Sequence, residues 1–180
     1  MALSICVFCA SSNAVASQFH DAAAQLGALI GQGKHTLVYG GGCIGLMGVL
    51  ARAVHRYGGH VIGVIPDTMV DKELAYRDAD ELIVTDNMRQ RKALMDERCD
   101  AFVALPGGFG TLEELLEVLT HRQLRYHDKP IVIVNTGGFY DLLLTLFEHV
   151  MALRFAKQRC RETYRVVGDP DAAMALLDAS

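Results

Sequence analysis

Short apolar segments alternate with longer helix-forming segments along this whole sequence, and this constrains the fold more than any other feature. The apolar segments are rich in valine and isoleucine and show no internal alternation with polar residues, which is typical of parallel strands buried on both faces. Strands are predicted at Ser4–Phe8, Thr36–Tyr39, Val61–Ile65, Leu82–Val84, Ala101–Leu105, Ile131–Asn135 and Arg165–Val167. Helices are predicted at Ala16–Gly31, Gly45–Tyr57, Met88–Arg98, Leu112–Tyr126, Tyr140–Leu153 and Asp171–Leu177. Repeated strand–helix units favour an α/β fold with a mainly parallel sheet flanked by helices.

The length and composition fit one domain. A chain of 180 residues buries a sizeable core but is short for two domains. Its 51% hydrophobic and 21% charged residues indicate a globular protein. We therefore predict that residues 1–180 form a single Rossmann-like, doubly wound domain.

The net charge and the chain start exclude several classes of partner. At a formal net charge of −4 we expect no nucleic acid as partner, because duplex binders carry a strongly basic face. The net charge does not exclude a small anionic ligand, because such a ligand needs only a few local hydrogen-bond donors. No apolar run reaches the roughly 20 residues that span a bilayer, and Met1–Phe8 lacks the basic start of a secretory signal. We expect a cytoplasmic protein with no membrane partner.

The five cysteines do not suggest a metal site. Cys6 and Cys9 have metal-ligand spacing, but no second pair of ligands follows at a matching interval. An alternating strand also directs these two side chains to opposite faces. The remaining cysteines, Cys43, Cys99 and Cys160, are scattered. We expect thiols in a reducing compartment, with no metal and no cofactor.

Three loops with unusual chemistry follow predicted strands. They comprise Cys9–Ser12, the glycine-rich segment Gly40–Gly48, and the turn Pro106–Thr111. Open α/β sheets bind ligands beyond the carboxyl ends of their strands, and glycine-rich turns at helix N-termini expose amides that bind anions. The Gly40–Gly48 loop lacks the spacing of a dinucleotide fingerprint and the Gly-Lys-Ser/Thr of a P-loop. It is either an anion site or a tight strand–helix turn.

The segment after the last of these turns admits two interpretations. Thr111 as N-cap and Glu114 three residues later form a capping box, while Glu113 favours the positive end of the helix dipole. Alternatively, a carboxylate held one sugar's width from a bound phosphate is well placed to assist cleavage at a ribose, where the transition state resembles an oxocarbenium ion.

An arginine is expected on an inward helix face. With Asp86 or Asn87 as N-cap, Arg91 projects from the apolar face of the predicted helix, whereas Arg89 lies towards solvent. An unpaired buried charge is costly, so Arg91 needs a partner. The candidates are a structural carboxylate (Asp96, Glu97 or Asp100), the substrate, or the catalytic carboxylate.

The motifs together resemble one family closely. Met88–Ala93 (MRQRKA), Asp100–Leu105 (DAFVAL) and Pro106–Glu114 (PGGFGTLEE) are similar to the signature of the LOG (Lonely Guy) family of cytokinin riboside 5′-monophosphate phosphoribohydrolases. Val7–Ser12, the triple-glycine loop and His127–Pro130 match as well. The resemblance spans nearly the whole chain and fades after about Ala156.

The resemblance implies a Rossmann-like homodimer, with its site near the interface, that splits an N6-modified AMP into free base and ribose 5-phosphate without a metal or cofactor. It implies that Arg91 and Glu114 are catalytic. The substrate, a nucleoside 5′-monophosphate, is expected to contact Gly107, Gly108, Gly110, Thr111, Glu113, Glu73, Ser12, Gly42, Met88 and Lys92.

Some residues depart from the family pattern. Where members read Thr-Trp-Ala-Gln-Leu-Gly, this chain has Thr120-His121-Arg122-Gln123-Leu124-Arg125, and Ala10 replaces a glycine. These changes affect the expected preference for the base, and His121 is the histidine to test for contact with it. Two alternatives stay open: a nucleosidase for AMP or other purine nucleotides, and a non-catalytic carrier of nucleotides or molybdopterin cofactor. Nothing in the sequence supports the older description of such proteins as lysine decarboxylases.

Overall fold

One seven-stranded sheet forms the centre of the protein. The computed structural model describes residues 2–70 and 74–179. Within them lie β1 (Ser4–Phe8), β2 (Thr36–Tyr39), β3 (His60–Pro66), β4 (Glu81–Thr85), β5 (Ala101–Ala104), β6 (Ile131–Val134) and β7 (Arg165–Val167). The strand order is β4-β3-β2-β1-β5-β6-β7, and each of the neighbouring pairs is parallel. The predicted fold and the seven predicted strands are confirmed, with ends that differ by at most one residue.

Six helices of nine residues or more alternate with the strands in the described ranges. They are α1 (Ser17–Gln32), α2 (Gly45–Arg56), α4 (Met88–Glu97), α5 (Phe109–Gln123), α6 (Asp141–Ala152) and α7 (Pro170–Asp178). The short α3 (Asp67–Met69) and two 3-10 turns, η2 (Thr136–Gly138) and η3 (Gln158–Thr163), were not predicted. None of the described helices is long and apolar enough to cross a membrane.

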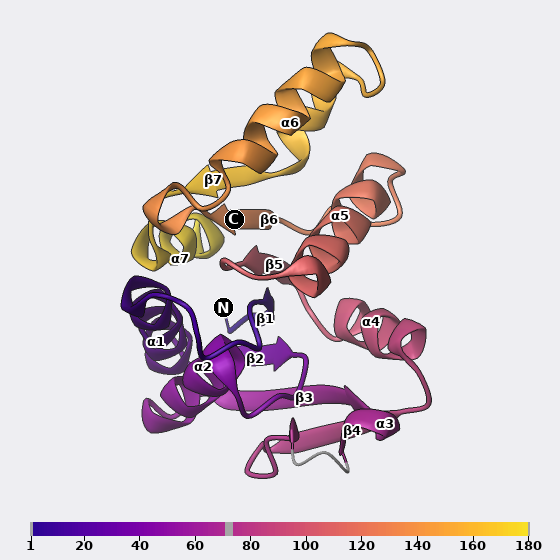
Figure 1. Cartoon of the computed structure of the whole chain (residues 1–180). Helices are drawn as coiled ribbons and strands as arrows, with labels where there is room; N and C mark the ends of the chain where they lie inside the picture. Colours follow the sequence, from indigo (N-terminus) through magenta and orange to yellow (C-terminus); the bar gives the residue numbers. More distant parts are fainter. Residues whose placement is uncertain (1, 71–73, 180) are drawn as a thin grey trace.

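The helices cover the sheet in two layers (Figure 1). On one face α1, α2 and α7 pack against Ile5 and Val7 of β1, and on the other α4, α5 and α6 pack against Cys6 and Phe8. Cys9 belongs to the first of these clusters. Cys6 and Cys9 therefore lie on opposite faces, as the strand alternation predicts.

The strand order creates a switch point between β1 and β5. From β1 the chain moves outward through β2 and β3 to β4, then returns to pair β5 with the other side of β1. The loops after β1 and β5 thus lead to helices on opposite faces of the sheet, and a crevice opens between them. The two loops are joined where the amide of Ala10 donates to the Pro106 carbonyl at 3.3 Å.

Helix α5 begins three residues earlier than predicted. Gly108 is its N-cap, with no side-chain capping bond, and the amide of Leu112 already donates to the Gly108 carbonyl at 3.0 Å. Thr111 is therefore inside the helix, and the predicted Thr111–Glu114 capping box is wrong. The helix also ends at Gln123, before the predicted Tyr126, because Arg125 adopts a left-handed conformation with φ of 65°.

Candidate active site

Arg91 is buried beside the carboxyl end of the sheet, as its helical position predicts. Asn87 caps α4 by accepting hydrogen bonds from the amides of Arg89 and Gln90, which fixes the first turn. Arg91 is 9% exposed, its Nε donates to the Val64 carbonyl at 3.1 Å, and its Nη1 lies 3.3 Å from Oε1 of Glu114. Its partner is thus the predicted catalytic carboxylate.

Gly40 makes room for this guanidinium. It follows β2 directly, and a Cβ at this position would lie 1.9 Å from Nη2 of Arg91. No side chain other than hydrogen fits there without displacing the arginine. The sequence reasoning treated Gly40 only as part of a glycine-rich turn. The signal was present, because an inward arginine needs empty space next to the strand ends.

Glu114 lies on the first turns of α5 and is 7% exposed. Burial raises the pKa of its carboxyl above the ordinary range of a glutamate, and the Arg91 guanidinium opposes that rise. Because both partners are buried, removing either one leaves an uncompensated charge, which costs about 3–5 kcal/mol. A buried carboxylate held at a strand–helix junction with a shifted pKa is a typical functional arrangement.

The turn before α5 forms an open cradle. A Cβ on Gly107 would lie 2.1 Å from Oγ1 of the buried Thr111, so this glycine is needed for tight packing. A Cβ on Gly108 or Gly110 would meet nothing within 4 Å. Gly108, the N-cap, and Gly110, in the first turn, are thus exposed at a helix N-terminus that has no side-chain cap. Such an N-terminus favours a negative group through its amides and its dipole.

The triple-glycine loop and the α2 helix after it are bonded to the loop that follows β1. The first-turn amides of α2 are already engaged: Gly45 donates to Oδ1 of Asn13 at 2.9 Å, and Leu46 and Met47 donate to the Ala10 carbonyl at 3.0 and 3.3 Å. These amides bind the loop after β1 and are not open to a ligand. This engagement fits a tight strand–helix turn, whereas an anion site at the amides of Gly40, Gly41 and Gly42 stays a prediction.

Two other predicted contacts lie in or near this loop. Gly42 forms an isolated antiparallel bridge with Ala75, and its carbonyl accepts a hydrogen bond from the hydroxyl of Tyr39. Ser12 is exposed and its hydroxyl accepts from the amide of Ala14. Glu73 lies outside the described residues.

Lys92 connects α4 to α5. Its ammonium forms ion pairs with Glu113 and, at 2.9 Å, with Glu117. Partial burial works to lower the pKa of Lys92, but the hydrogen bonds to both carboxylates outweigh it and the pKa is raised. Met88 is partly exposed, and its sulfur lies 3.8 Å from Nη1 of Arg91. The sequence reasoning missed Glu117, although it lies one helical turn after Glu113 and therefore on the same face.

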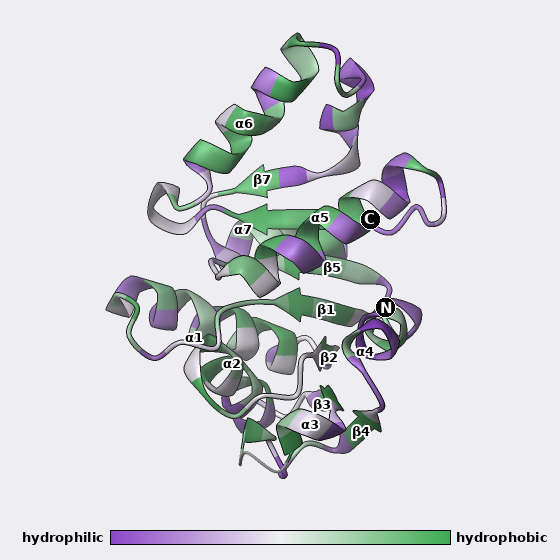
Figure 2. Ribbon diagram, turned by 45° about the vertical axis from the view of Figure 1, so that its right-hand side comes forward, coloured by the Kyte–Doolittle hydropathy of each residue, from purple (hydrophilic) through white to green (hydrophobic). Residues whose placement is uncertain are grey.

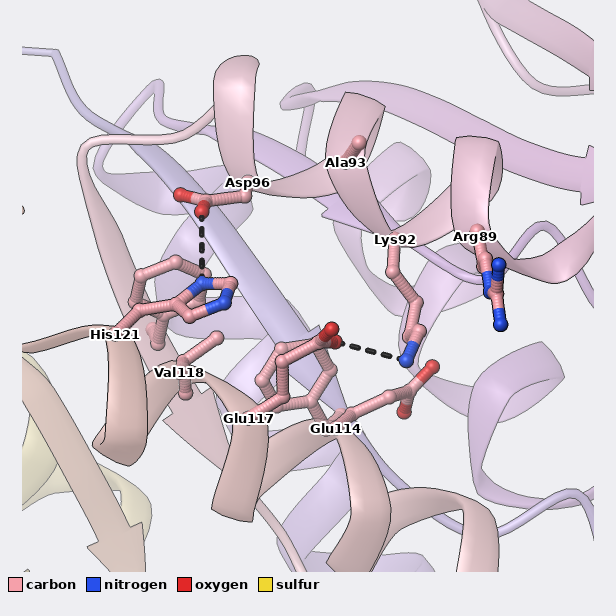
Figure 3. Close-up of a pocket in the computed structure, with 10 residues that line it drawn as sticks. Arg89, Lys92, Ala93, Asp96, Glu114, Glu117, Val118 and His121 are labelled. Atoms are coloured by element: carbon pink, nitrogen blue, oxygen red, sulfur yellow. Dashed lines mark ion pairs between the residues drawn. The ribbon is translucent and has the colours of Figure 1, made fainter. Parts of the chain in front are cut away.

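A cavity of about 100 Å³, here called the α4–α5 slot, runs between these two helices. Figure 3 shows its labelled wall residues, with Glu114 at one end and His121 at the other. The aromatic rings of Phe8 and Phe102, stacked with centroids 5.9 Å apart, also line it. In the part of the chain that the structure describes, no group of three or more His, Cys, Asp or Glu side chains could hold a metal ion.

The fold and the site together define a class of protein: a doubly wound α/β protein with a buried arginine–glutamate pair and a glycine-rich helix N-terminus without a side-chain cap at its topological switch point. Comparison of the sequence with known protein families and proteins identifies the family within this class. The family model described as possible lysine decarboxylase matches residues 47–177. The chain is 45% identical to cytokinin riboside 5′-monophosphate phosphoribohydrolase LOG2 of Arabidopsis thaliana, over 96% of this chain and 80% of that protein.

Two further relatives belong to the same family. Cytokinin riboside 5′-monophosphate phosphoribohydrolase LOG4 of Arabidopsis thaliana is 48% identical over 88% of this chain and 74% of its own length. The probable enzyme LOGL9 of Oryza sativa subsp. japonica is 46% identical over 93% and 73%. The chain belongs to the LOG family.

Solved structures with the same fold have lower identity. The molybdenum cofactor binding protein of Rippkaea orientalis superposes with a TM-score of 0.76 at 21% identity, covering 99% of this chain and 97% of that one. The Moco carrier protein of Chlamydomonas reinhardtii gives 0.73 at 23% identity, with the same coverage. At this identity the likeness concerns the fold alone.

Proposed function

We propose that this protein hydrolyses the N-glycosidic bond of N6-modified AMP, a cytokinin riboside 5′-monophosphate, to release the free base and ribose 5-phosphate. One observation carries the proposal: the buried Arg91–Glu114 pair adjoins a helix N-terminus that is open to an anion. The names of the relatives that are 45–48% identical support the same reaction.

The 5′-phosphate binds at the cradle in front of α5. Gly108 and Gly110 let its oxygens approach the backbone, and the amides of the first turn donate to them. The phosphate supplies binding energy remote from the bond that breaks, so a riboside without it reacts poorly. Lys92 of α4 and Glu113 of α5, which form an ion pair, contact the nucleoside.

Glu114 acts on the ribose. In its ionised form it stabilises the positive charge that develops on the sugar and accepts a proton from the attacking water. Arg91 holds the carboxylate in place through the 3.3 Å pair and binds the substrate on its other side with its planar donor fork. The hydrogen bond to the Val64 carbonyl holds the guanidinium in this position, and the absence of a side chain at Gly40 leaves room for it.

The protein works as a homodimer with the site near the interface. Exposed apolar side chains gather on α5, α6 and the segments that follow them: Leu116, Leu124, Tyr126, Leu142, Leu146, Leu153 and Phe155. Figure 2 shows α6 as a largely hydrophobic helix that projects from the body of the protein. A second copy of the chain is the partner that covers this surface. The buried thiols of Cys6 and Cys99 fit a reducing compartment such as the cytoplasm.

The decisive experiment measures base release from three compounds: N6-isopentenyl-AMP, AMP and N6-isopentenyladenosine. We expect rapid release from the first and slow release from the riboside. In Glu114→Gln, kcat falls on the order of 10²-fold or more while binding is kept. Equal rates with AMP would favour a broader purine nucleotide nucleosidase. Tight binding of nucleotide or molybdopterin without any release of base would indicate a carrier.

A further inference from the structure

The α4–α5 slot connects the proposed catalytic carboxylate to a histidine. The two helices run in the same direction and are linked by two successive cross-helix pairs, Lys92–Glu117 at 2.9 Å and Asp96–His121 at 3.8 Å (Figure 3). Phe8, Phe102, Ala93 and Val118 give the slot apolar walls, and the paired side chains of Lys92 and Glu117 line it as well. It is therefore a narrow slot with apolar walls and a charged rim, with Glu114 at one end and the imidazole of His121 at the other.

The length of the slot matches a base with a substituent. Glu114 and His121 are seven residues apart on one helix, which separates them by roughly 10 Å along its axis. With bonds near 1.5 Å, the span from the glycosidic carbon across a purine to the end of a five-carbon substituent is also on the order of 10 Å. A cavity of about 100 Å³ admits such a substituent but no purine. The purine therefore lies at the mouth of the slot, beside Glu114, and the substituent alone extends towards His121.

His121 has an imidazole that is not saturated by the protein. Asp96, its neighbour, is held by Nζ of Lys129 at 2.8 Å through Oδ1. The distance of 3.8 Å from Nδ1 of His121 to Oδ2 of Asp96 exceeds a hydrogen bond, and the described residues provide no side-chain hydrogen bond to this ring. The imidazole is thus available to a polar atom that enters the slot.

From this arrangement we propose that the slot receives the N6-substituent of the base, and that His121 selects substituents that end in a hydroxyl over purely hydrocarbon ones. The inference rests on the proposed function, since it concerns the base that the enzyme releases. Phe8, Phe102 and Val118 contact the hydrocarbon part of the substituent, and His121 forms one hydrogen bond with the terminal hydroxyl. Neither contact contributes to the cradle for the phosphate.

The test compares kcat/KM for N6-isopentenyl-AMP and for its analogue with a hydroxyl on the terminal methyl. We expect a preference for the hydroxylated substrate that falls about threefold to tenfold in His121→Leu, as the loss of one hydrogen bond implies. Activity on the hydrocarbon substrate is kept. The matched control His149→Leu changes an exposed histidine on α6 and leaves the preference as it was. An unchanged preference in a folded His121→Leu protein would overturn the proposal.

Measurements of nucleotide binding test this proposal independently of the proposed function. In Glu114→Gln, calorimetry gives the Kd of both nucleotides without turnover, and we expect the same preference, lost in the double variant with His121→Leu. If the wild-type protein releases no base, the proposed function is wrong, yet these Kd values still decide what the slot binds. If neither substituent improves binding over AMP, the substituent does not enter the slot.

Discussion

Glu114 and Glu113 follow one another in the chain but occupy opposite environments. Glu114 points inward to Arg91, whereas Glu113 is largely exposed and pairs with Lys92. The charge on Glu113 adds to the rise in the pKa of Glu114 that burial causes, and Arg91 limits it. The carboxyl that is proposed to act on the sugar is therefore the one whose protonation the protein controls.

This control predicts a pH dependence. Glu114 acts in its ionised form, and its pKa in the folded protein is raised. Activity is thus present at neutral pH and is lost as the pH falls through a pKa higher than that of an exposed glutamate. The acid limb of the pH profile of kcat/KM measures this pKa. In Glu117→Gln, which removes a negative charge that contributes to the rise, the limb moves to lower pH. A limb in the ordinary glutamate range would contradict the assignment.

A second prediction concerns Gly40. In Gly40→Ala the new Cβ meets Nη2 of Arg91, so the guanidinium moves away from Glu114. A displacement of about 1 Å in a catalytic group costs on the order of 10²-fold in kcat, while crowding costs about 1–3 kcal/mol of stability. Steady-state kinetics and thermal unfolding measure the two effects. The control is Gly168→Ala, where a Cβ meets nothing within 4 Å. Full activity in Gly40→Ala would show that Arg91 need not stay where it is.

At the scale of the element, the start of α5, proposed to bind the phosphate, differs from the part of the helix that packs into the core. Its N-terminus starts on glycines and carries no side-chain cap, whereas Leu115 and Val118 pack into the core. A helix start without a cap is less stable than a capped one by about 1 kcal/mol. We infer that this helix gives up stability at the end that is proposed to bind the phosphate.

Gly110→Ala tests this inference. Gly110 lies in the first turn of α5, and a Cβ there has open space in the free protein. Alanine is favoured over glycine in a helix by about 0.5–1 kcal/mol, so unfolding shifts to higher temperature. The same methyl group obstructs the phosphate, and kcat/KM falls roughly tenfold through the loss of one charge-assisted hydrogen bond. Affinity for the riboside, which has no phosphate, stays unchanged. A more stable variant with unimpaired kinetics would place the phosphate elsewhere.

The start of α5 also shows where sequence reasoning reached its limit. Hydrophobic periodicity predicted the strands and the inward direction of Arg91, because both follow from local pattern. The helix start was wrong because glycine has a low helix propensity, and the packing of Thr111 against Gly107 overrides it. The role of Gly40 and the engagement of the α2 amides by Ala10 depend on contacts between distant segments, which no local pattern reveals.

At the scale of the whole molecule, the exposed apolar side chains of α6 predict a dimer. A stable interface buries about 800 Å² on each subunit, and Leu142 and Leu146 lie at its proposed centre. In Leu146→Glu a buried charge has no partner, so the sedimentation coefficient falls to that of a monomer. Val84→Glu introduces the same charge on β4, at the far edge of the sheet, and leaves the assembly intact. A wild-type protein that sediments as a monomer would contradict the proposed interface.

The central position of β1 affects how the protein folds during its synthesis on the ribosome. Ile5 of β1 pairs with Ala101 of β5, which leaves the ribosome almost a hundred residues after it. Until then one long edge of the nascent sheet lacks its neighbour, and such distant pairings form slowly. The crevice between the loops after β1 and β5 is incomplete until β5 and α5 have been synthesised. A prematurely ended chain is therefore both inactive and prone to join the open edge of another copy.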